Sequence, residues 1–140
     1  MDKGYDLQRF VDAQQGVHAT ALAELRAGRK RSHWMWFVFP QIAGLGHSEM
    51  ARRYAIASAG EAAAYLAHPL LGARLRECAS AVATHPERAV GEIFGSPDDL
   101  KFHSSMTLFA SVAPHEAVFQ DCLDRFFGGA PDAATIGRLS

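Results

Sequence analysis

The sequence predicts an all-α fold, with one compact domain of about seven short helices over residues 1–140. Three observations predict this fold. Apolar residues recur at helical spacing, capping residues precede most of those segments, and no segment alternates apolar and polar residues between hairpin turns. The 140 residues, of which 49% are apolar, are enough to build one packed core.

Most of the expected helices begin at a residue whose side chain can cap the free N–H groups of the first turn. A proline directly after such a residue fits the first helical position. The first helix is expected to run unbroken from Asp6 to Gly28, and the segment 34–39 is expected to form a helix that ends at Pro40. The other expected starts are Ser32, Ser48, Ser58 with Glu61, His68-Pro69, His85-Pro86, Ser96-Pro97, about His115 (ending at Gly128) and Asp132.

The basic residues are concentrated in one part of the chain, although the formal net charge is only -1. The segment 25–47 holds no acidic residue and contains Arg26, Arg29, Lys30 and Arg31. Such a local positive field favours an anionic partner, but cations after a helix C-terminus also complement the helix dipole. With a pI near 6.6, the chain lacks the basic balance of a general nucleic-acid binder.

Several classes of protein are disfavoured by what the sequence lacks. No stretch approaches the roughly 20 apolar residues that span a bilayer. The first residues lack the apolar core of a signal peptide, so we expect a soluble cytoplasmic protein that does not bind a membrane. Cys78 and Cys122 do not make a disulfide scaffold. The seven histidines show no metal-ligand spacing, so we expect no metal and no cofactor.

Two polar residues interrupt the apolar face of the helix expected over 97–112. On a helical wheel, Lys101 and Ser105 lie inside the apolar arc, whereas His103, Ser104, Thr107 and Ser111 lie on the opposite, polar side. A lysine in an apolar stripe either extends to solvent or meets an anion. Serine has no stem with which to reach water, which favours a pocket. We therefore expect the Lys101 ammonium in a cleft with the 33–48 segment.

Three weaker features occur in the first half of the chain. Gln14 and His18 are four residues apart on the expected first helix and can touch each other, either as a structural pair or within a polar network. The turn at Gly44–Ser48, with Arg52 close by, can present backbone N–H groups to a phosphate, although an ordinary glycine turn explains it too. The aromatic residues Trp34 and Trp36 can stack on a ring, but such residues are also typical of a core.

The strings His33-Trp34-Met35-Trp36-Phe37-Val38-Phe39-Pro40-Gln41, Gly44-Leu45-Gly46 and Ser104-Ser105-Met106-Thr107-Leu108-Phe109 resemble the bacterial domain-of-unknown-function family 1810, some members of which are labelled calpastatin. The resemblance covers most of the chain and implies one mainly helical domain, with no established activity. A more distant similarity to helical NADAR-type domains, which process ADP-ribose conjugates, rests on no motif match. The family signature marks Gln14, Trp34, Trp36, Gln41, Gly44, Gly46, Lys101, Ser104, Ser105 and Thr107.

These observations lead to two hypotheses of different kinds. The first is a site for a phosphorylated, ring-bearing small molecule, such as a nucleotide or an ADP-ribose derivative. If the protein is an enzyme, this hypothesis predicts hydrolysis of a glycosidic bond with Glu49 or Asp99 as acid/base. The second is a non-catalytic interaction module that docks through the aromatic segment 34–39. The candidate ligand-binding residues of the first hypothesis are Gln14, Trp34, Trp36, Gln41, Gly44, Gly46, Ser48, Arg52, Lys101, Ser104, Ser105 and Thr107.

Overall fold

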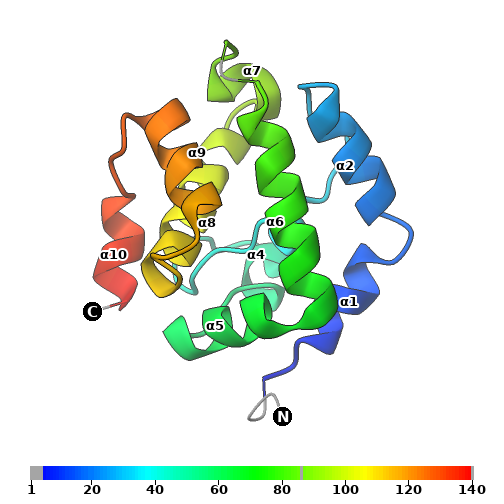
Figure 1. Ribbon diagram of the computed structural model, residues 1–140. Helices are drawn as coiled ribbons and strands as arrows, with labels where there is room; N and C mark the ends of the chain where they lie inside the picture. The colour runs from blue at the N-terminus through cyan, green and yellow to red at the C-terminus, as the bar shows by residue number, and fades with distance from the viewer. Residues whose placement is uncertain (1–4, 86, 140) are drawn as a thin grey trace.

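A computed structural model describes residues 5–85 and 87–139 and confirms the all-α prediction (Figure 1). Among these residues the one pairing of β type is an isolated parallel bridge between Ile42 and Ile56. The helices in this part of the chain are α1 (Gln8–Gln14), α2 (His18–Arg26), α3 (Met35–Val38), α4 (Glu49–Arg53), α5 (Ala59–Ala67), α6 (Pro69–Ala83), α7 (Val90–Phe94), α8 (Asp98–Val112), α9 (Ala117–Phe127) and α10 (Ala133–Leu139).

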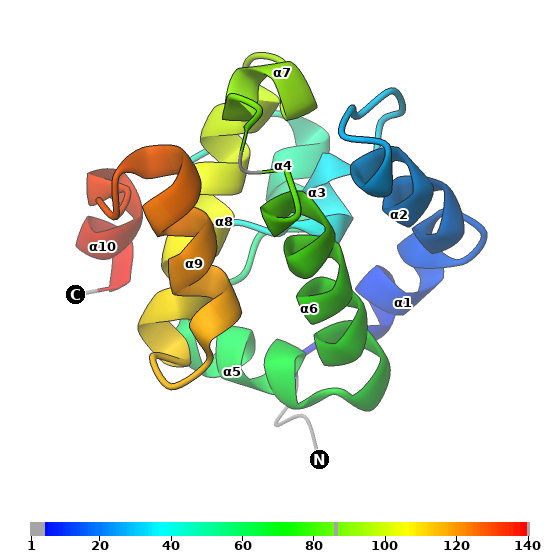
Figure 2. The same cartoon turned by 45° about the horizontal axis from the view of Figure 1, so that its top comes forward.

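Helices α6 and α8 form the centre of the molecule. α8 contacts α5, α7, α9 and α10, and α6 contacts α1, α2, α3, α5 and α9. In Figures 1 and 2, α9 and α10 lie on one side of α6, and α1 and α2 lie on the other. No helix in the described ranges is long and apolar enough to cross a membrane.

The expected first helix is broken into two, which corrects the prediction of one helix from Asp6 to Gly28. α1 ends at Gln14 and α2 begins at His18, with Gly16 between them at a φ of +76°. This left-handed backbone conformation suits glycine and ends a helix. The apolar spacing continued across the break because both helices bury a face in the same core.

The aromatic segment 34–39 forms one helical turn, α3, and is largely buried. Trp36 is partly exposed, while the other five residues of the segment are buried. The Phe39 and Phe94 rings pack against Phe102 of α8 with centroids 5.0 and 4.6 Å away. The helix prediction is confirmed, although Ser32 is not its cap, because the Ser32 hydroxyl donates to Glu24 instead.

Several predicted caps are confirmed. Ser48 Oγ accepts from the N–H of Ala51, Ser58 Oγ accepts from that of Glu61, and His68 Nδ1 accepts from those of Leu70 and Leu71. Each of these side chains satisfies donors that the first turn of a helix leaves free. At the C-terminal end, Gly128 ends α9 in the left-handed conformation, with a φ of +62°.

Two other predicted starts are wrong. α8 begins after Pro97, which stands at its N-cap position, and no side chain caps this helix. His85 does not begin a helix either, because its Nε2 lies 3.0 Å from the carbonyl oxygen of Leu25 at the end of α2, and α7 starts later, at Val90. Residue 86, the proline that was expected to follow the cap, lies outside the described residues.

The polar side expected for α8 is buried, which corrects the helical-wheel prediction for Ser104 and Thr107. Ser104 is 6% exposed and Thr107 is 1% exposed. Asp132, just before α10, covers them: its Oδ2 accepts from Ser104 Oγ at 3.1 Å and its N–H donates to Thr107 Oγ1 at 2.9 Å. The Asp132 carboxylate also caps α10 by accepting from the N–H of Thr135, as the sequence predicts.

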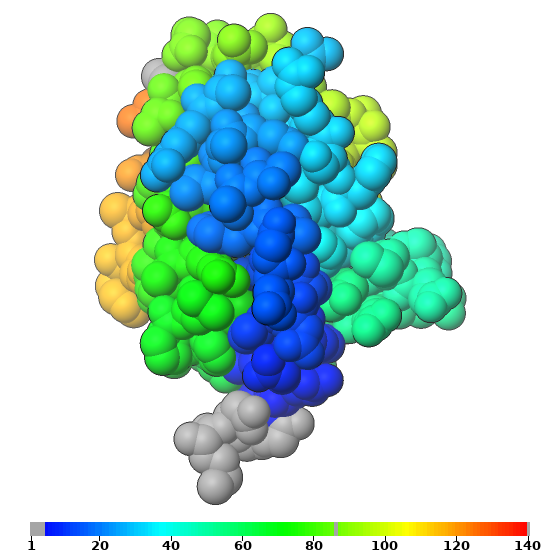
Figure 3. Space-filling model, turned by 90° about the vertical axis from the view of Figure 1, so that its right-hand side faces the viewer, coloured from blue at the N-terminus to red at the C-terminus, as the bar shows by residue number. Residues whose placement is uncertain are grey.

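Helix α4 lies on an arm that projects from the body of the molecule (Figure 3). None of the α4 residues is buried. The base of the arm is closed by the bridge beside Ile56, where the Ile56 N–H donates to the carbonyl of Gln41 at 2.8 Å and the Ile56 carbonyl accepts from Ala43 at 2.8 Å. The Gly44–Ser48 turn therefore belongs to the arm and not to the core.

Candidate functional site

A surface pocket of about 410 Å³ lies between the loop after α2 and helix α7. We call it the α2–α7 pocket. Its volume falls in the range of about 300–1,000 Å³ that small-molecule sites occupy. The residues that line it are Arg29, Lys30, Arg88, Gly91, Glu92, Ile93, Phe94 and Gly95.

The wall of the pocket is built where α2 ends at a glycine. Gly28 has a φ of +82°, which turns the chain out of the helix. The N–H of Lys30 then donates to the carbonyl of Ile93 at 2.7 Å and ties the loop to α7. Arg88 crosses the same glycine: a Cβ at Gly28 would lie 2.9 Å from Arg88 Nε. Glycine at this position thus allows Arg88 to lie across the turn beside Arg29.

Positive charge predominates on the pocket wall. Arg29, Lys30 and Arg88 contribute three cations, and Glu92 contributes the one carboxylate among the lining residues. Arg29 and Arg88 are exposed, and within residues 5–85 and 87–139 neither guanidinium has a carboxylate or hydrogen-bond partner. Two guanidinium groups without a carboxylate partner in the described ranges leave this part of the pocket wall positively charged.

Lys30 connects the pocket to a cluster of charged and aromatic side chains. Its ammonium lies 2.8 Å from Asp98 Oδ2 and 5.1 Å from the ring centroid of Trp34, and its side chain is 8% exposed. The other oxygen of Asp98 lies 3.4 Å from the ammonium of Lys101. Lys101 in turn lies 5.1 Å from the ring centroid of Trp36. Asp98 thus bridges two lysines, each of which covers one tryptophan.

Glu24 fixes the loop that carries Lys30. Its carboxylate accepts from Trp34 Nε1 at 2.9 Å and from the N–H groups of Arg31 and Ser32 at 2.8 and 3.0 Å. Burial acts to raise the pKa of Glu24, but these hydrogen bonds and one from the Ser32 hydroxyl outweigh it, so the pKa lies below 4.5. The ionised carboxylate therefore holds the loop against α2.

The geometry around Lys101 agrees with the cleft expected from the sequence in one respect and differs in another. The ammonium lies against the 33–48 segment, over Trp36, and does not stand free in solvent, because the side chain is 25% exposed. Lys101 is paired with Asp98, however, and is not among the residues that line the α2–α7 pocket. Trp34 is fully buried, so it presents no ring face to a ligand.

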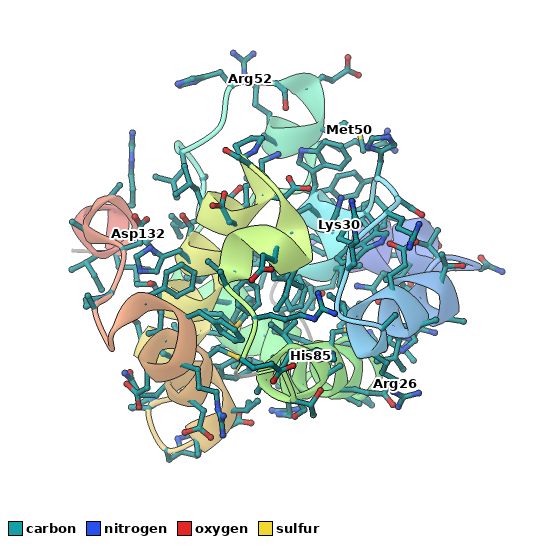
Figure 4. The ribbon with its side chains drawn as sticks, turned by 90° about the horizontal axis from the view of Figure 1, so that it is seen from above. Arg26, Lys30, Met50, Arg52, His85 and Asp132 are labelled. Carbon is teal, nitrogen blue, oxygen red and sulfur yellow. The ribbon has the colours of Figure 1, made fainter. Side chains whose placement is uncertain are left out.

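The Gly44–Ser48 turn lies apart from this cluster. The carbonyl of Gly44 accepts from Arg138 Nη2 at 3.3 Å, and Arg52 is exposed on the projecting α4. Figure 4 shows Arg52 at the outer edge of the molecule and Lys30 near its middle. Gly46 approaches α4 closely, since a Cβ there would lie 2.6 Å from that of Ala51. No contact in the described part of the chain joins Arg52 to Lys101.

The remaining candidate residues have structural surroundings. Gln14 is buried with all its polar atoms partnered: Nε2 donates to the Phe37 carbonyl at 2.7 Å and to Tyr65, and Oε1 accepts from Arg74 at 3.3 Å. His18 does not touch Gln14, which corrects the expected pair, because it pairs with Glu77 of α6 at 3.2 Å.

The two carboxylates considered as acid/base lie outside the pocket lining. Glu49 is exposed in the first turn of α4, and Asp99 accepts a hydrogen bond from the N–H of Leu100 at 2.9 Å. Burial raises the pKa of both Cys78 and Cys122 to about 12, which keeps these thiols protonated and unreactive. Ser105 is fully buried, and its hydroxyl has no partner among the described residues.

Sequence reasoning did not find Arg88 or Glu92, and it did not separate Asp98 from Asp99. The basic run already pointed to Arg29 and Lys30, but these other residues lie between 77 and 140, where nine acidic residues outnumber four basic ones. Their role appears only when α7 and the start of α8 pack beside the loop after α2. No signal in the sequence distinguishes Asp98 from its neighbour Asp99, since both are acidic residues at a helix start.

The fold and the pocket define a small all-α protein with a basic surface pocket. A family model described as "Protein of unknown function (DUF1810)" matches residues 4–139, and the chain belongs to this family. The fold is shared with the crystal structure of the conserved hypothetical protein Rv1873 from Mycobacterium tuberculosis, with 53% sequence identity, 96% of each chain covered and a TM-score of 0.95. A search of curated proteins finds no match.

Proposed function

We propose that this protein binds a small phosphorylated, ring-bearing molecule of the nucleotide or ADP-ribose class in the α2–α7 pocket. The observation that carries the proposal is the presence of Arg29 and Arg88 in one pocket, with no acidic partner for either guanidinium in the described ranges. A guanidinium offers a planar pair of N–H donors that matches two oxygens of a phosphate. An anion there gains charge-assisted hydrogen bonds and breaks no existing ion pair of these two arginines.

Lys30 adds a third cation with a different environment. Its ammonium is nearly buried and is already paired with Asp98. Its charge is therefore largely offset by Asp98, and the two arginines supply the mobile donors of the pocket. The lining residues carry a formal charge of about +2 when Glu92 is counted against the three cations, and Asp98, which is not a lining residue, offsets part of that charge.

The cations of the pocket support the phosphate part of the proposal, whereas the two tryptophans do not support stacking on the ring. Neither Trp34 nor Trp36 is among the residues that line the pocket. Hydrolysis of a glycosidic bond by Glu49 or Asp99 stays a prediction, because the pocket lining includes neither carboxylate. Docking of a partner through 34–39 stays a prediction too, and of these six residues Trp36 alone keeps a partly exposed side chain.

Isothermal titration calorimetry with ADP-ribose, AMP and inorganic phosphate tests the proposal. We expect binding of the two nucleotides, and a loss of at least about tenfold in affinity in Arg88→Gln, because one charge-assisted contact contributes roughly 1.5–3 kcal/mol. Arg125→Gln is the matched control, since Arg125 is exposed on α9 and lines no part of this pocket. Its affinity should equal that of the wild-type protein.

Two results would overturn the proposal. One is the absence of any heat or thermal stabilisation with all three ligands at millimolar concentration, since a ligand at 100 times its Kd adds about 2.7 kcal/mol of stability. The other is a loss of affinity in Arg52→Gln together with unchanged affinity in Arg88→Gln. That outcome would place the anion on the Gly44–Ser48 turn and not in the pocket.

A further inference from the structure

Glu92 lies in the same pocket as three cations without forming an ion pair with any of them. No lysine or arginine nitrogen in the described part of the chain comes within 4.0 Å of its carboxylate. The pocket therefore separates its charges, with Arg29, Lys30 and Arg88 as one set and the carboxylate of Glu92 as the other. A ligand that bridges the two sets needs an anionic group and a hydrogen-bond donor.

The carboxylate of Glu92 is held in place by the backbone of its own helix. Its Oε1 accepts from the N–H of Ala89 at 2.8 Å, and the Glu92 N–H donates to the Ala89 carbonyl at 3.0 Å. These two bonds join Glu92 to Ala89, the N-cap residue of α7, in both directions, although alanine has no side chain that could complete a capping box. The second oxygen, Oε2, has no partner among the described residues. The side chain thus presents a preoriented acceptor, which lowers the ordering cost of binding.

We infer that the α2–α7 pocket selects phosphorylated sugars with free hydroxyl groups, with the arginines on the phosphate and Glu92 Oε2 accepting from a ligand hydroxyl. This inference rests on the function proposed above and names the class of ligand. A carboxylate that faces solvent inside a pocket accepts hydrogen bonds from hydroxyl or ammonium groups. The excess of positive charge on the wall repels an ammonium group, whereas a neutral hydroxyl meets no such penalty. Among phosphorylated molecules, this favours a ribose phosphate over an amino phosphate.

Calorimetry on the full chain with AMP, 2′,3′-dideoxy-AMP and inorganic phosphate tests the inference. AMP and the dideoxy compound share the phosphate and the ring and differ in the two ribose hydroxyls. We expect AMP to bind at least about tenfold more tightly than the dideoxy compound, the ratio expected for one hydrogen bond to a charged acceptor. Glu92→Gln is the matched variant, because its amide oxygen can still accept from Ala89 while its NH₂ group cannot accept from a hydroxyl.

In Glu92→Gln the tenfold difference should fall to below about threefold, while the affinity for inorganic phosphate stays the same or rises, because a negative charge has been removed. Equal affinities of AMP and dideoxy-AMP for the wild-type protein would overturn the inference and leave the phosphate site standing. A difference that persists unchanged in Glu92→Gln would also overturn it. Failure of all three ligands to bind the wild-type protein would overturn the proposed function itself.

Discussion

The carboxylate of Asp98 lies 2.8 Å from the ammonium of Lys30, at the point where the start of α8 meets the loop after α2. Lys30 keeps only 8% of its side chain exposed, and Asp98 keeps 20%. An ammonium so far removed from water needs a charged partner, and Asp98 is the acid that provides it. The same carboxylate also lies 3.4 Å from Lys101, so one aspartate forms ion pairs with both lysines.

Asp98→Asn should lower the free energy of unfolding by about 1–3 kcal/mol, because it leaves the nearly buried ammonium of Lys30 without a charged partner. Urea-induced unfolding followed by circular dichroism measures the change. Asp99→Asn is the control: the carboxylate of Asp99 accepts only from the adjacent N–H of Leu100, so we expect a change below about 0.5 kcal/mol. Equal losses in the two variants would contradict the role assigned to Asp98.

Lys101→Met should change the free energy of unfolding by less than about 1 kcal/mol. The Lys101 side chain is 25% exposed, and the variant loses one ion pair and one contact with the Trp36 ring, each of which contributes about 0.5–1 kcal/mol at such sites. The methionine recovers part of this by packing on the same ring. Thermal and urea unfolding check the value. A loss above 3 kcal/mol would show that Lys101 is an essential part of the core.

The same variant separates Lys101 from the pocket. With Lys101 removed, Asp98 neutralises Lys30 more completely, so phosphate affinity should fall by less than about fivefold, against at least about tenfold for Arg88→Gln. A complete loss of binding in Lys101→Met would instead place the ligand over Trp36, where the helical wheel first suggested a site.

The sequence predicted the fold class well because capping chemistry is local. Ser48, Ser58, His68 and Asp132 begin helices in the structure because each satisfies backbone donors a few residues ahead. The break at Gly16 was missed because the apolar spacing of α1 and α2 runs through it. Spacing reports which residues face a core, and two helices on the same core share that spacing.

The candidate site was predicted less well because it depends on contacts between distant segments. The basic run includes Arg29 and Lys30, which line the pocket. Ser104 and Thr107 were placed on a polar face, yet Asp132 covers them. A helical wheel treats one side of a helix as solvent, and α8 has neighbours all round it. For the same reason Arg88 was not linked to Arg29 by the sequence.

Glu24→Gln should lower the free energy of unfolding by about 1–3 kcal/mol at pH 7, because the carboxylate accepts hydrogen bonds from Trp34, Arg31 and Ser32. The pKa of Glu24 is below its usual 4.5 in the folded protein. The stability that the ionised form contributes is therefore present above pH 4.5 and is lost as the pH falls through the folded-state pKa.

The difference between wild-type protein and Glu24→Gln should consequently narrow as the pH falls from 5 towards about 3. Urea unfolding at a series of pH values measures it. Glu87→Gln serves as the control, since that side chain is 68% exposed and its one contact, with His85, is 3.9 Å long. A difference for Glu24→Gln that stays constant across this pH range would show that its charge does not hold the loop.

Gly72→Ala should destabilise the protein, although alanine is the better helix former by about 1 kcal/mol. Gly72 lies in α6, and a Cβ there would come within 2.1 Å of the Leu66 carbonyl oxygen in α5. A backbone carbonyl cannot rotate away as a side chain does, so α5 and α6 must separate, at a cost of about 1–3 kcal/mol.

Gly137→Ala in α10 is the matched substitution, because nothing lies within 4 Å of a Cβ there, and it should stabilise the protein by up to about 1 kcal/mol. Urea midpoints of the two variants should therefore shift in opposite directions from the wild-type value, and a Gly72→Ala protein as stable as the wild type would show that the two helices do not approach this closely.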